Sequence, residues 1–212
     1  MRLRYKPWAD EFIKQNQHLI LPNAEVYKGQ WNAFFNNNHP IHLEIGTGKG
    51  QFIAEMSRKY SDINFIGIER AKSVIADAGE KIQDVGATNV VLLNEDASEL
   101  THFFATQEID VIYLNFSDPW PKNRHEKRRL TYHTFLRAYQ DILSPRGEII
   151  LKTDNQGFFE YSLVSLSQFG FVLTEVNLDL HATADPDNVM TEYEEKFLAK
   201  KQRIYRCRAQ IK

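Results

Sequence analysis

Residues 109–129 read IDVIYLNFSDPWPKNRHEKRR and fall into three parts. Residues 109–116 form an apolar, β-branched and aromatic run of strand length, which predicts a buried strand. Pro119 and Pro121 then fix the backbone φ angle and lack an amide donor, so strand pairing must stop there. The last part, residues 122–129, is a short loop rich in lysine and arginine. A buried strand that carries a carboxylate, a tryptophan and a basic loop at its carboxyl end predicts a functional site.

Strands of this kind alternate with helices along most of the chain. The predicted strands span residues 41–45, 64–69, 89–94, 110–116, 148–153, 171–177 and 203–210, and the predicted helices span residues 50–60, 71–85, 97–105, 134–143 and 156–168. Apolar strands that alternate with helices are typical of a parallel sheet with helices on both faces. Because no clear helix separates the last two strands, we expect residues 181–195 to form a long loop and the final strand to run antiparallel. A charged helix start at residues 191–194 is the alternative to a loop there. The predicted fold class is therefore α/β, with a seven-stranded, mostly parallel sheet in residues 41–212.

Residues 1–40 are polar and irregular, with a short helix predicted at residues 10–17. They contain Trp8, Phe12 and Trp31, and such large apolar side chains are poorly tolerated in fully solvated segments. We therefore expect an arm that packs on the main domain and is mobile at its start. The alternative is a disordered leader without function.

Composition limits the class of protein. With 212 residues the chain can form one full core. No apolar run approaches the roughly 20 residues of a membrane span, and the first residues lack the apolar core of a signal peptide. The only cysteine, Cys207, cannot form an internal disulfide, and the histidines lack metal-ligand spacing. These features predict a cytoplasmic protein with no membrane segment and no metal.

The distribution of charge matters more than its sum. The formal net charge is −2, which by itself argues against a nucleic-acid partner. However, cations cluster at residues 2–6, 122–129 and 196–212, and the last of these segments contains no acidic residue. This pattern predicts a local positive face on a nearly neutral protein. The alternative is an ordinary solvated surface.

A glycine-rich turn follows the first strand of the main domain. Residues 44–50 read EIGTGKG, and glycine lets a backbone turn sharply and approach a ligand closely. The third glycine of the dinucleotide-binding pattern would come one residue later. A phosphate loop would continue with Ser or Thr after Lys49, where this chain has Gly50. The alternative is a plain strand-to-helix turn.

Four acidic residues lie at the carboxyl ends of four successive strands: Glu44, Glu69, Asp96 and Asp118. The carboxyl ends of parallel strands meet at one edge of the sheet, where open α/β folds bind ligands. Each acid alone could be a helix cap, and Asp96 is the clearest case. Together they disfavour a phosphate-bearing cofactor and favour one with cationic groups and hydroxyl or amine donors. S-adenosylmethionine has an ammonium, a sulfonium, ribose hydroxyls and an adenine amine.

These residues resemble a known pattern. The turn at residues 44–50, with Glu69 and Asp96, is similar to the cofactor site of the class I, Rossmann-like methyltransferases. The segment NFSDPWPK at residues 115–122, with the basic run after it, resembles the tRNA (guanine-N7-)-methyltransferase family more specifically. The resemblance extends over residues 43–129, 152–154 and 190–196.

The resemblance implies a Rossmann-like methyltransferase fold, S-adenosylmethionine as cofactor and tRNA as partner, with a variable-loop guanine methylated at N7. Asp118 would lie at the reaction centre. The implied cofactor contacts are Glu44, Gly46, Gly48, Gly50, Glu69, Asp96 and Asp118. The implied substrate contacts are Lys122, Asp154, Thr191, Glu192, Tyr193 and Glu194. The implied RNA contacts are Arg124, His125, Glu126, Lys127, Arg128 and Arg129. We expect a monomer or homodimer that needs no other protein.

The chemistry supports this set of roles. N7 of guanine carries a lone pair and no proton, so methylation needs positioning rather than a general base. Asp118 could accept hydrogen bonds from the Watson–Crick edge of guanine and offset the charge that N7 acquires. Trp120 could stack on the target base or support the turn between the prolines.

Three other functions remain open at this point. A methyltransferase acting on another RNA or on a small molecule would share the cofactor site, although the basic loop argues against a small molecule. The glycine spacing and the number of acids argue against a nicotinamide-dependent oxidoreductase. A non-catalytic RNA-binding partner of an enzyme would not need the complete set of acids.

Overall fold

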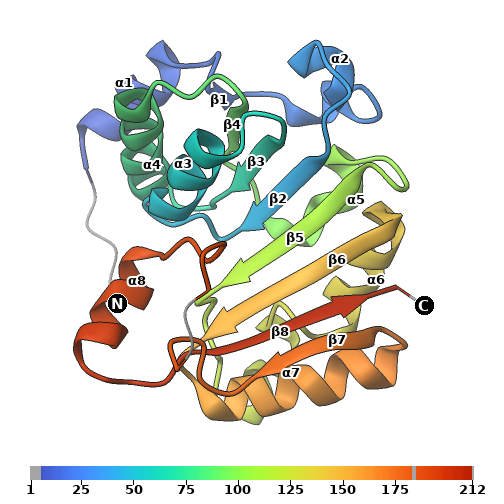
Figure 1. The fold of residues 1–212 in the computed structure, drawn as a ribbon. Coiled ribbons are helices and arrows are strands. Elements are labelled where there is room, and N and C mark those ends of the chain that lie inside the picture. The colour runs from blue at the N-terminus through green and yellow to red at the C-terminus, as the bar shows by residue number, and fades with distance from the viewer. Residues whose placement is uncertain (1–5, 183–184, 212) are drawn as a thin grey trace.

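The computed structural model describes residues 6–182 and 185–211. Its strands form one eight-stranded sheet in the order β1-β4-β3-β2-β5-β6-β8-β7 (Figure 1). The strands are β1 (Ile20–Leu21), β2 (Ile41–Ile45), β3 (Asn64–Ile68), β4 (Val90–Leu93), β5 (Ile109–Asn115), β6 (Leu143–Thr153), β7 (Val172–Asn177) and β8 (Tyr205–Gln210). Strand β8 is antiparallel to both of its neighbours, and the other neighbouring pairs are parallel. The predicted fold class and the antiparallel last strand are therefore confirmed.

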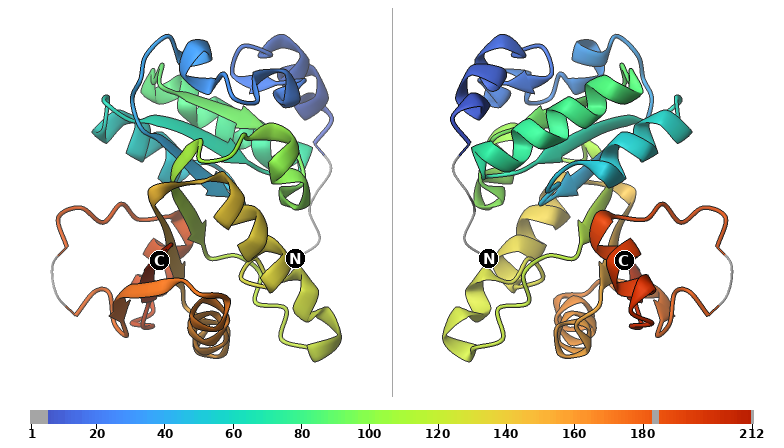
Figure 2. Two further views of the ribbon diagram at one scale, coloured as in Figure 1. Left: turned by 90° about the vertical axis from the view of Figure 1, so that its right-hand side faces the viewer. Right: turned by 90° about the vertical axis from the view of Figure 1, so that its left-hand side faces the viewer.

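Helices lie on both sides of the strands, as the turned views in Figure 2 show. The helices are α1 (Trp8–Gln15), α2 (Trp31–Phe35), α3 (Gln51–Lys59), α4 (Lys72–Val85), α5 (Leu100–Phe103), α6 (His133–Ile142), α7 (Gln156–Phe169) and α8 (Glu192–Ala199). Short 3-10 helices occur at η1 (Ala24–Tyr27), η2 (Ala97–Glu99) and η3 (Asn123–Arg128). Apolar side chains of α3 and α4 form one buried cluster with the sheet, and those of α5, α6 and α7 form another. No helix in the described part of the chain is long and apolar enough to cross a bilayer.

The prediction of seven strands was wrong by one, because the arm contributes β1. Its two residues pair in parallel with β4, Ile20 opposite Leu92 and Leu21 opposite Leu93. A two-residue strand is too short to show the alternation by which strands are recognised in a sequence. The strand exists because both side chains are buried against the sheet.

Two further boundaries differ from expectation. Strand β6 begins at Leu143, which pairs with Ile109, and a bulge then lets the next pair be Val111 and Glu148. Residues 144–147, which lie between the predicted helix 134–143 and the predicted strand 148–153, form this bulge. The expected loop at residues 181–195 ends in a helix, because α8 begins at Glu192.

The start of α8 is stabilised by a local cap. The side-chain oxygen of Thr191 accepts a hydrogen bond from the Glu194 amide at 3.0 Å, and three acidic residues occupy the first turn. The pattern Thr-x-x-Glu before a helix is the sequence signature of a capping box, so the signal for this helix was present.

The arm is held to the domain by buried contacts. Trp31 is fully buried, and its ring nitrogen donates to the Phe103 carbonyl at 3.0 Å. The Glu108 carboxylate accepts from the amides of Gly29 and Trp31 at 3.0 and 3.3 Å. Helix α1 packs on α4 where a Cβ at Gly79 would lie 2.7 Å from the Phe12 ring. The mobility expected at the start of the arm concerns residues 1–5, which lie outside the described residues.

Replacing Trp31 with alanine is expected to destabilise the whole domain by about 3–5 kcal/mol, because it leaves a large cavity and an unpaired carbonyl. Chemical denaturation followed by circular dichroism measures this loss. Val26→Ala is the matched control, since Val26 is an exposed apolar residue of the same arm. An equally small effect of both substitutions would mean that the arm does not stabilise the domain.

Candidate active site

The acidic residues of the central strands emerge at one edge of the sheet. Strands β4, β3, β2 and β5 are adjacent and parallel, so their carboxyl ends point the same way. Glu44 lies in β2, Glu69 directly follows β3, and Asp96 and Asp118 follow β4 and β5. The four acids therefore occur in the spatial order Asp96, Glu69, Glu44, Asp118 along this edge.

Glu44 is buried with only part of its hydrogen-bonding capacity used. It is 3% exposed, and its Oε1 accepts from Asn115 Nδ2 at 2.9 Å. Within the described residues, Glu44 Oε2 and Asn115 Oδ1 have no hydrogen-bond partner. Burial raises the pKa of Glu44 to about 8, against the opposing effects of Asn115 and the Lys152 charge. Two buried acceptors without donors are suited to a ligand that brings a cationic donor.

The glycine turn beside Glu44 has a backbone that other residues rarely adopt. Gly46, Gly48 and Gly50 have φ values of 77°, 60° and 80°. A Cβ at Gly50 would lie 2.6 Å from Ala78 of α4, whereas at Gly46 it would meet no protein atom within 4 Å. The turn is thus packed on its helix side and open at Gly46, so a ligand can approach the backbone there.

Glu69 ties this turn to the end of β3. Its two carboxylate oxygens accept from the amides of Gly48 and Ala71 at 3.2 and 2.8 Å. Burial raises the pKa of Glu69, although these amide hydrogen bonds oppose the shift. Each oxygen keeps a second lone pair, so the carboxylate can still accept from a ligand hydroxyl.

Asp96 forms the helix cap that the sequence left open as an alternative. Its Oδ1 accepts from the Ser98 amide at 2.9 Å, and this hydrogen bond lowers its pKa. The other oxygen lies 3.4 Å from the Arg70 guanidinium. Capping and ligand binding are compatible here, because about half of the Asp96 side chain is exposed.

Asp118 stands on a strained turn. The preceding Phe116 has a φ of 51°, and Trp120 has a φ of 41°. The Phe116 amide donates to the Lys152 carbonyl at 2.8 Å, which extends the β5–β6 pairing to the start of the turn. Asp118 is exposed, and in the part of the chain that the structure describes no group hydrogen-bonds to its carboxylate. Strain that tertiary contacts maintain next to a free carboxylate is typical of a functional site.

Trp120 packs against the basic loop and contacts three of its residues. Its carbonyl accepts from Arg129 at 3.1 and 3.3 Å, and its ring contacts the Arg128 guanidinium at 4.9 Å and the His125 ring at 5.7 Å. Arg129 also lies over the Tyr161 ring at 4.2 Å. Lys122, Arg124, Lys127 and Arg128 are exposed, whereas His125, Glu126 and Arg129 are half-buried. The loop therefore presents four cations to solvent and uses the others for packing.

The other predicted substrate residues differ in how accessible they are to a ligand. Asp154 follows β6 at the same edge and is half-buried. Tyr193 is 50% exposed and stacks on Phe116 at a ring distance of 6.4 Å. By contrast, Thr191 and Glu194 are buried, and Glu192 forms an ion pair with Lys81.

Comparison with known proteins agrees with this geometry. A family model described as "Putative methyltransferase" matches residues 38–207. A tRNA (guanine-N(7)-)-methyltransferase of Oceanobacillus iheyensis is 60% identical over 99% of this chain and 98% of its own length. Proteins of the same name from Geobacillus kaustophilus and Bacillus subtilis are 59% and 56% identical over 99% and 98% of this chain, and over 96% and 97% of their own lengths. This chain belongs to the tRNA (guanine-N(7)-)-methyltransferase family.

Solved structures with lower sequence identity share the fold of this family member. "Structure of an Antibiotic Related Methyltransferase" matches with a TM-score of 0.64 and 20% identity, over 85% of this chain and 92% of that one. A SAM dependent methyltransferase from Aquifex aeolicus matches with a TM-score of 0.59 and 13% identity, over 99% and 100% of the two chains. The predicted Rossmann-like methyltransferase fold is thereby confirmed. The family of the chain supports S-adenosylmethionine as its cofactor.

The positive face expected from the last segment of the chain is smaller than predicted. Arg206 pairs with Glu175 and Asp185 at 2.8 and 2.6 Å. Arg208 pairs with Glu148 and Glu175 at 3.2 and 3.1 Å. A strand that enters the sheet brings its arginines to acids on neighbouring segments, so their charge is not available to a partner.

Sequence reasoning did not assign site roles to Asn115 and Lys152. Both are buried at the ends of neighbouring strands, beside Glu44. The signal was a polar or charged residue at the end of an apolar strand, since such a group must find a partner in the interior.

The buried Glu44 predicts a dependence of stability on pH. In the unfolded chain this carboxyl ionises near its ordinary pKa, but in the folded protein it stays protonated until about pH 8. The folded state therefore binds more protons between these values, and stability falls as the pH rises. Glu44→Gln is expected to remove a loss on the order of 3 kcal/mol between pH 5 and 8.

Urea denaturation of the ligand-free protein at several pH values measures this slope. Glu160→Gln is the control, because Glu160 is an exposed carboxylate on α7. Parallel stability curves for the parent protein and Glu44→Gln would contradict the assigned burial.

Proposed function

We propose that this chain transfers the methyl group of S-adenosylmethionine to N7 of a guanine in tRNA. The proposal rests on one arrangement: buried acceptors at the glycine turn, an exposed carboxylate and a basic loop all reach the same edge of the sheet. The family membership of the chain supports the same activity.

The residues at this edge fit the cofactor. We propose that Glu44 Oε2 and Asn115 Oδ1 accept from its ammonium, because both are buried acceptors without donors. The backbone from Gly46 to Gly50 would line the nucleoside, Glu69 would accept from ribose hydroxyls, and Asp96 would lie near the adenine. When bound, S-adenosylmethionine supplies an electrophilic methyl group.

Asp118 is proposed to orient the target base. Its carboxylate is exposed and can accept hydrogen bonds from N1–H and the 2-amino group of guanine, a pair of donors that adenine lacks. It can also offset the positive charge that the base gains when N7 is alkylated. The turn that carries Asp118 is held by β5–β6 pairing, so the carboxylate is positioned before the base arrives. No proton has to be removed from N7.

The basic loop η3 is proposed to contact the tRNA backbone. Folded RNA is recognised mainly through phosphates and shape, and exposed Lys122, Arg124, Lys127 and Arg128 can reach phosphates. Half-buried His125, Glu126 and Arg129 would keep the loop in place while contacting the same RNA at their exposed edges. Of the other predicted substrate residues, Asp154 and Tyr193 are accessible to a nucleotide.

We also propose that the enzyme acts in the cytoplasm, as a monomer or homodimer without an obligatory protein partner. The support for this location is the proposed substrate, tRNA, together with the single buried cysteine, which suits a reducing compartment.

Asp118→Asn is expected to reduce methyl transfer by about 10²-fold or more, because a neutral amide cannot offset the charge that develops on the base. Transfer of labelled methyl groups to unmodified tRNA, followed by mapping of the modified base, measures this effect. Asp141→Asn is the control, since Asp141 is an exposed carboxylate on α6. Label on a base other than guanine, or undiminished transfer by Asp118→Asn, would sink the proposed mechanism.

The double substitution Arg124→Ala/Lys127→Ala is expected to weaken tRNA binding and leave cofactor affinity unchanged. The dependence of log affinity on log salt concentration should become shallower by about 1 for each phosphate that the variant no longer neutralises. Filter binding over a range of salt concentrations measures the slope. Arg146→Ala serves as the control, because Arg146 is exposed near the amino end of β6, away from the site. A slope that is unchanged by the double substitution would exclude η3 as the RNA-binding loop.

A further inference from the structure

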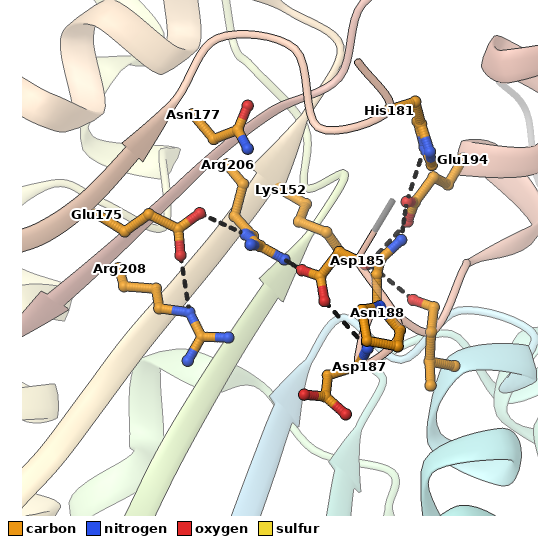
Figure 3. Close-up of polar contacts among 12 residues, drawn as sticks. Lys152, Glu175, Asn177, His181, Asp185, Asp187, Asn188, Glu194, Arg206 and Arg208 are labelled. Atoms are coloured by element: carbon orange, nitrogen blue, oxygen red, sulfur yellow. Dashed lines mark hydrogen bonds and ion pairs between the residues drawn. The ribbon is translucent and has the colours of Figure 1, made fainter. Parts of the chain in front are cut away.

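Lys152 is a buried lysine whose ammonium is fully engaged by one distant segment. The residue is 3% exposed at the end of β6. Its Nζ donates to Glu194 Oε2 at 2.7 Å, the Val189 carbonyl at 2.8 Å and Asn188 Oδ1 at 3.2 Å (Figure 3). Burial lowers the pKa of Lys152, and the Glu194 carboxylate opposes that shift. An ammonium in such a place persists only when it is paired and hydrogen-bonded.

Glu194 has no free oxygen with which to reach RNA. The residue is fully buried, and its Oε2 accepts from Lys152. Its Oε1 accepts from Asn188 Nδ2 at 2.7 Å and lies 3.1 Å from His181 Nε2. Thr191 is also buried, and its hydroxyl oxygen is used by the cap of α8. The family resemblance implies substrate contacts for both residues, but their contacts here are to the protein itself.

Besides Lys152, two other basic residues hold the segment that precedes α8. We call residues 185–191 the strap. Arg206 of β8 donates to Asp185 Oδ2 at 2.6 Å, at the start of the strap (Figure 3). Lys59 Nζ, from α3, donates to the Pro186 carbonyl at 2.8 Å. The strap has no regular secondary structure, so these contacts and those of Lys152 define its path over the end of the sheet.

The strap leads directly into α8. This helix contacts the turn that carries Asp118 and the residue that follows the glycine turn. Tyr193 and Phe197 stack on Phe116, two residues before Asp118, at ring distances of 6.4 and 5.9 Å. Glu195 accepts from Gln51 Nε2 at 2.7 Å, one residue after the glycine turn. The position of α8 is therefore linked to the Asp118 turn and to the cofactor turn.

We propose that Lys152 and Glu194 form a buried latch that seats α8 against the Phe116 turn, and that Thr191 and Glu194 are positioning residues that do not touch the tRNA. The inference rests on the proposed function, because its catalytic consequence is read in methyl transfer to tRNA. The latch acts through α8 on the Asp118 turn. Disruption of the latch should therefore lower the turnover number, while η3 and its exposed cations still bind the RNA.

A double-mutant cycle of Lys152→Met and Glu194→Gln tests the latch. Each single substitution leaves an unpaired buried partner, and we expect each to reduce kcat by at least about tenfold. The double substitution should be no worse than the more severe single one, since the two residues act as one unit. The dissociation constant for tRNA should change less than about twofold, because phosphate contacts dominate it.

The same cycle can overturn the proposal. If Glu194 touches the tRNA, Glu194→Gln will weaken tRNA binding even in the Lys152→Met background. Additive losses in kcat would likewise exclude a latch. Arg203→Met and Asp179→Asn form the matched control, because this exposed ion pair spans 3.8 Å and lies outside the strap and α8. Its removal should leave kcat unchanged.

Hydrogen exchange of the unaltered protein tests the latch without any substitution. The amides of Asn188, Glu194 and Glu195, which donate to oxygens of Asp185 and Thr191, should be protected, and they should remain protected when tRNA is added. Fast exchange of these amides in the free protein would exclude a closed latch, whether or not the single variants fold. If the unaltered protein transferred no methyl group to tRNA, the proposed function would fail, and the exchange data would still decide the latch.

Discussion

The site depends on the parallel pairing of β2 with its neighbours β3 and β5. This pairing places the carboxyl ends of three strands side by side, and the Glu44–Asn115 hydrogen bond joins two of them. A parallel sheet buries both faces under helices, and open α/β folds bind ligands at the carboxyl ends of their strands, so this edge carries the polar groups of the site. The glycine turn follows β2 and the Asp118 turn follows β5. Because these two strands are adjacent, the separation of the strands sets the distance between the two turns.

Polar groups at this edge are buried to a degree that is costly without a partner. Two neighbouring sites at this edge meet this cost in different ways. Lys152 and Glu194 satisfy each other, so their burial serves the structure of the protein itself. Glu44 is only partly satisfied, so its burial leaves an acceptor for a bound group. The contrast distinguishes a structural ion pair from a binding site, although both contain buried charged residues.

Much of the fold could be predicted because strand and helix signals are local. The segments that became β2 to β8 were long enough to show strand character, and glycines and prolines limited several of them. Strand β1 was missed because two residues carry no periodicity. Helix α8 was only the alternative to the expected loop, because no clear helix was recognised between the last two strands, although Thr191 and Glu194 have the spacing of a capping box. That the acids share one edge followed from parallel pairing alone, whereas their spatial order along it depends on the strand order of the sheet.

The sequence by itself determined the alternation of strands and helices, the edge at which the acids meet, and the basic loop after the Asp118 turn. These depend on neighbouring residues and on the rules of parallel sheets. Only the tertiary structure decided which charged groups are available to a partner. Glu44 and Asn115 are 71 residues apart in the chain, and Lys152 and Glu194 are 42 apart. Pairing and burial over such separations depend on the packing of the whole sheet, and no local pattern encodes them.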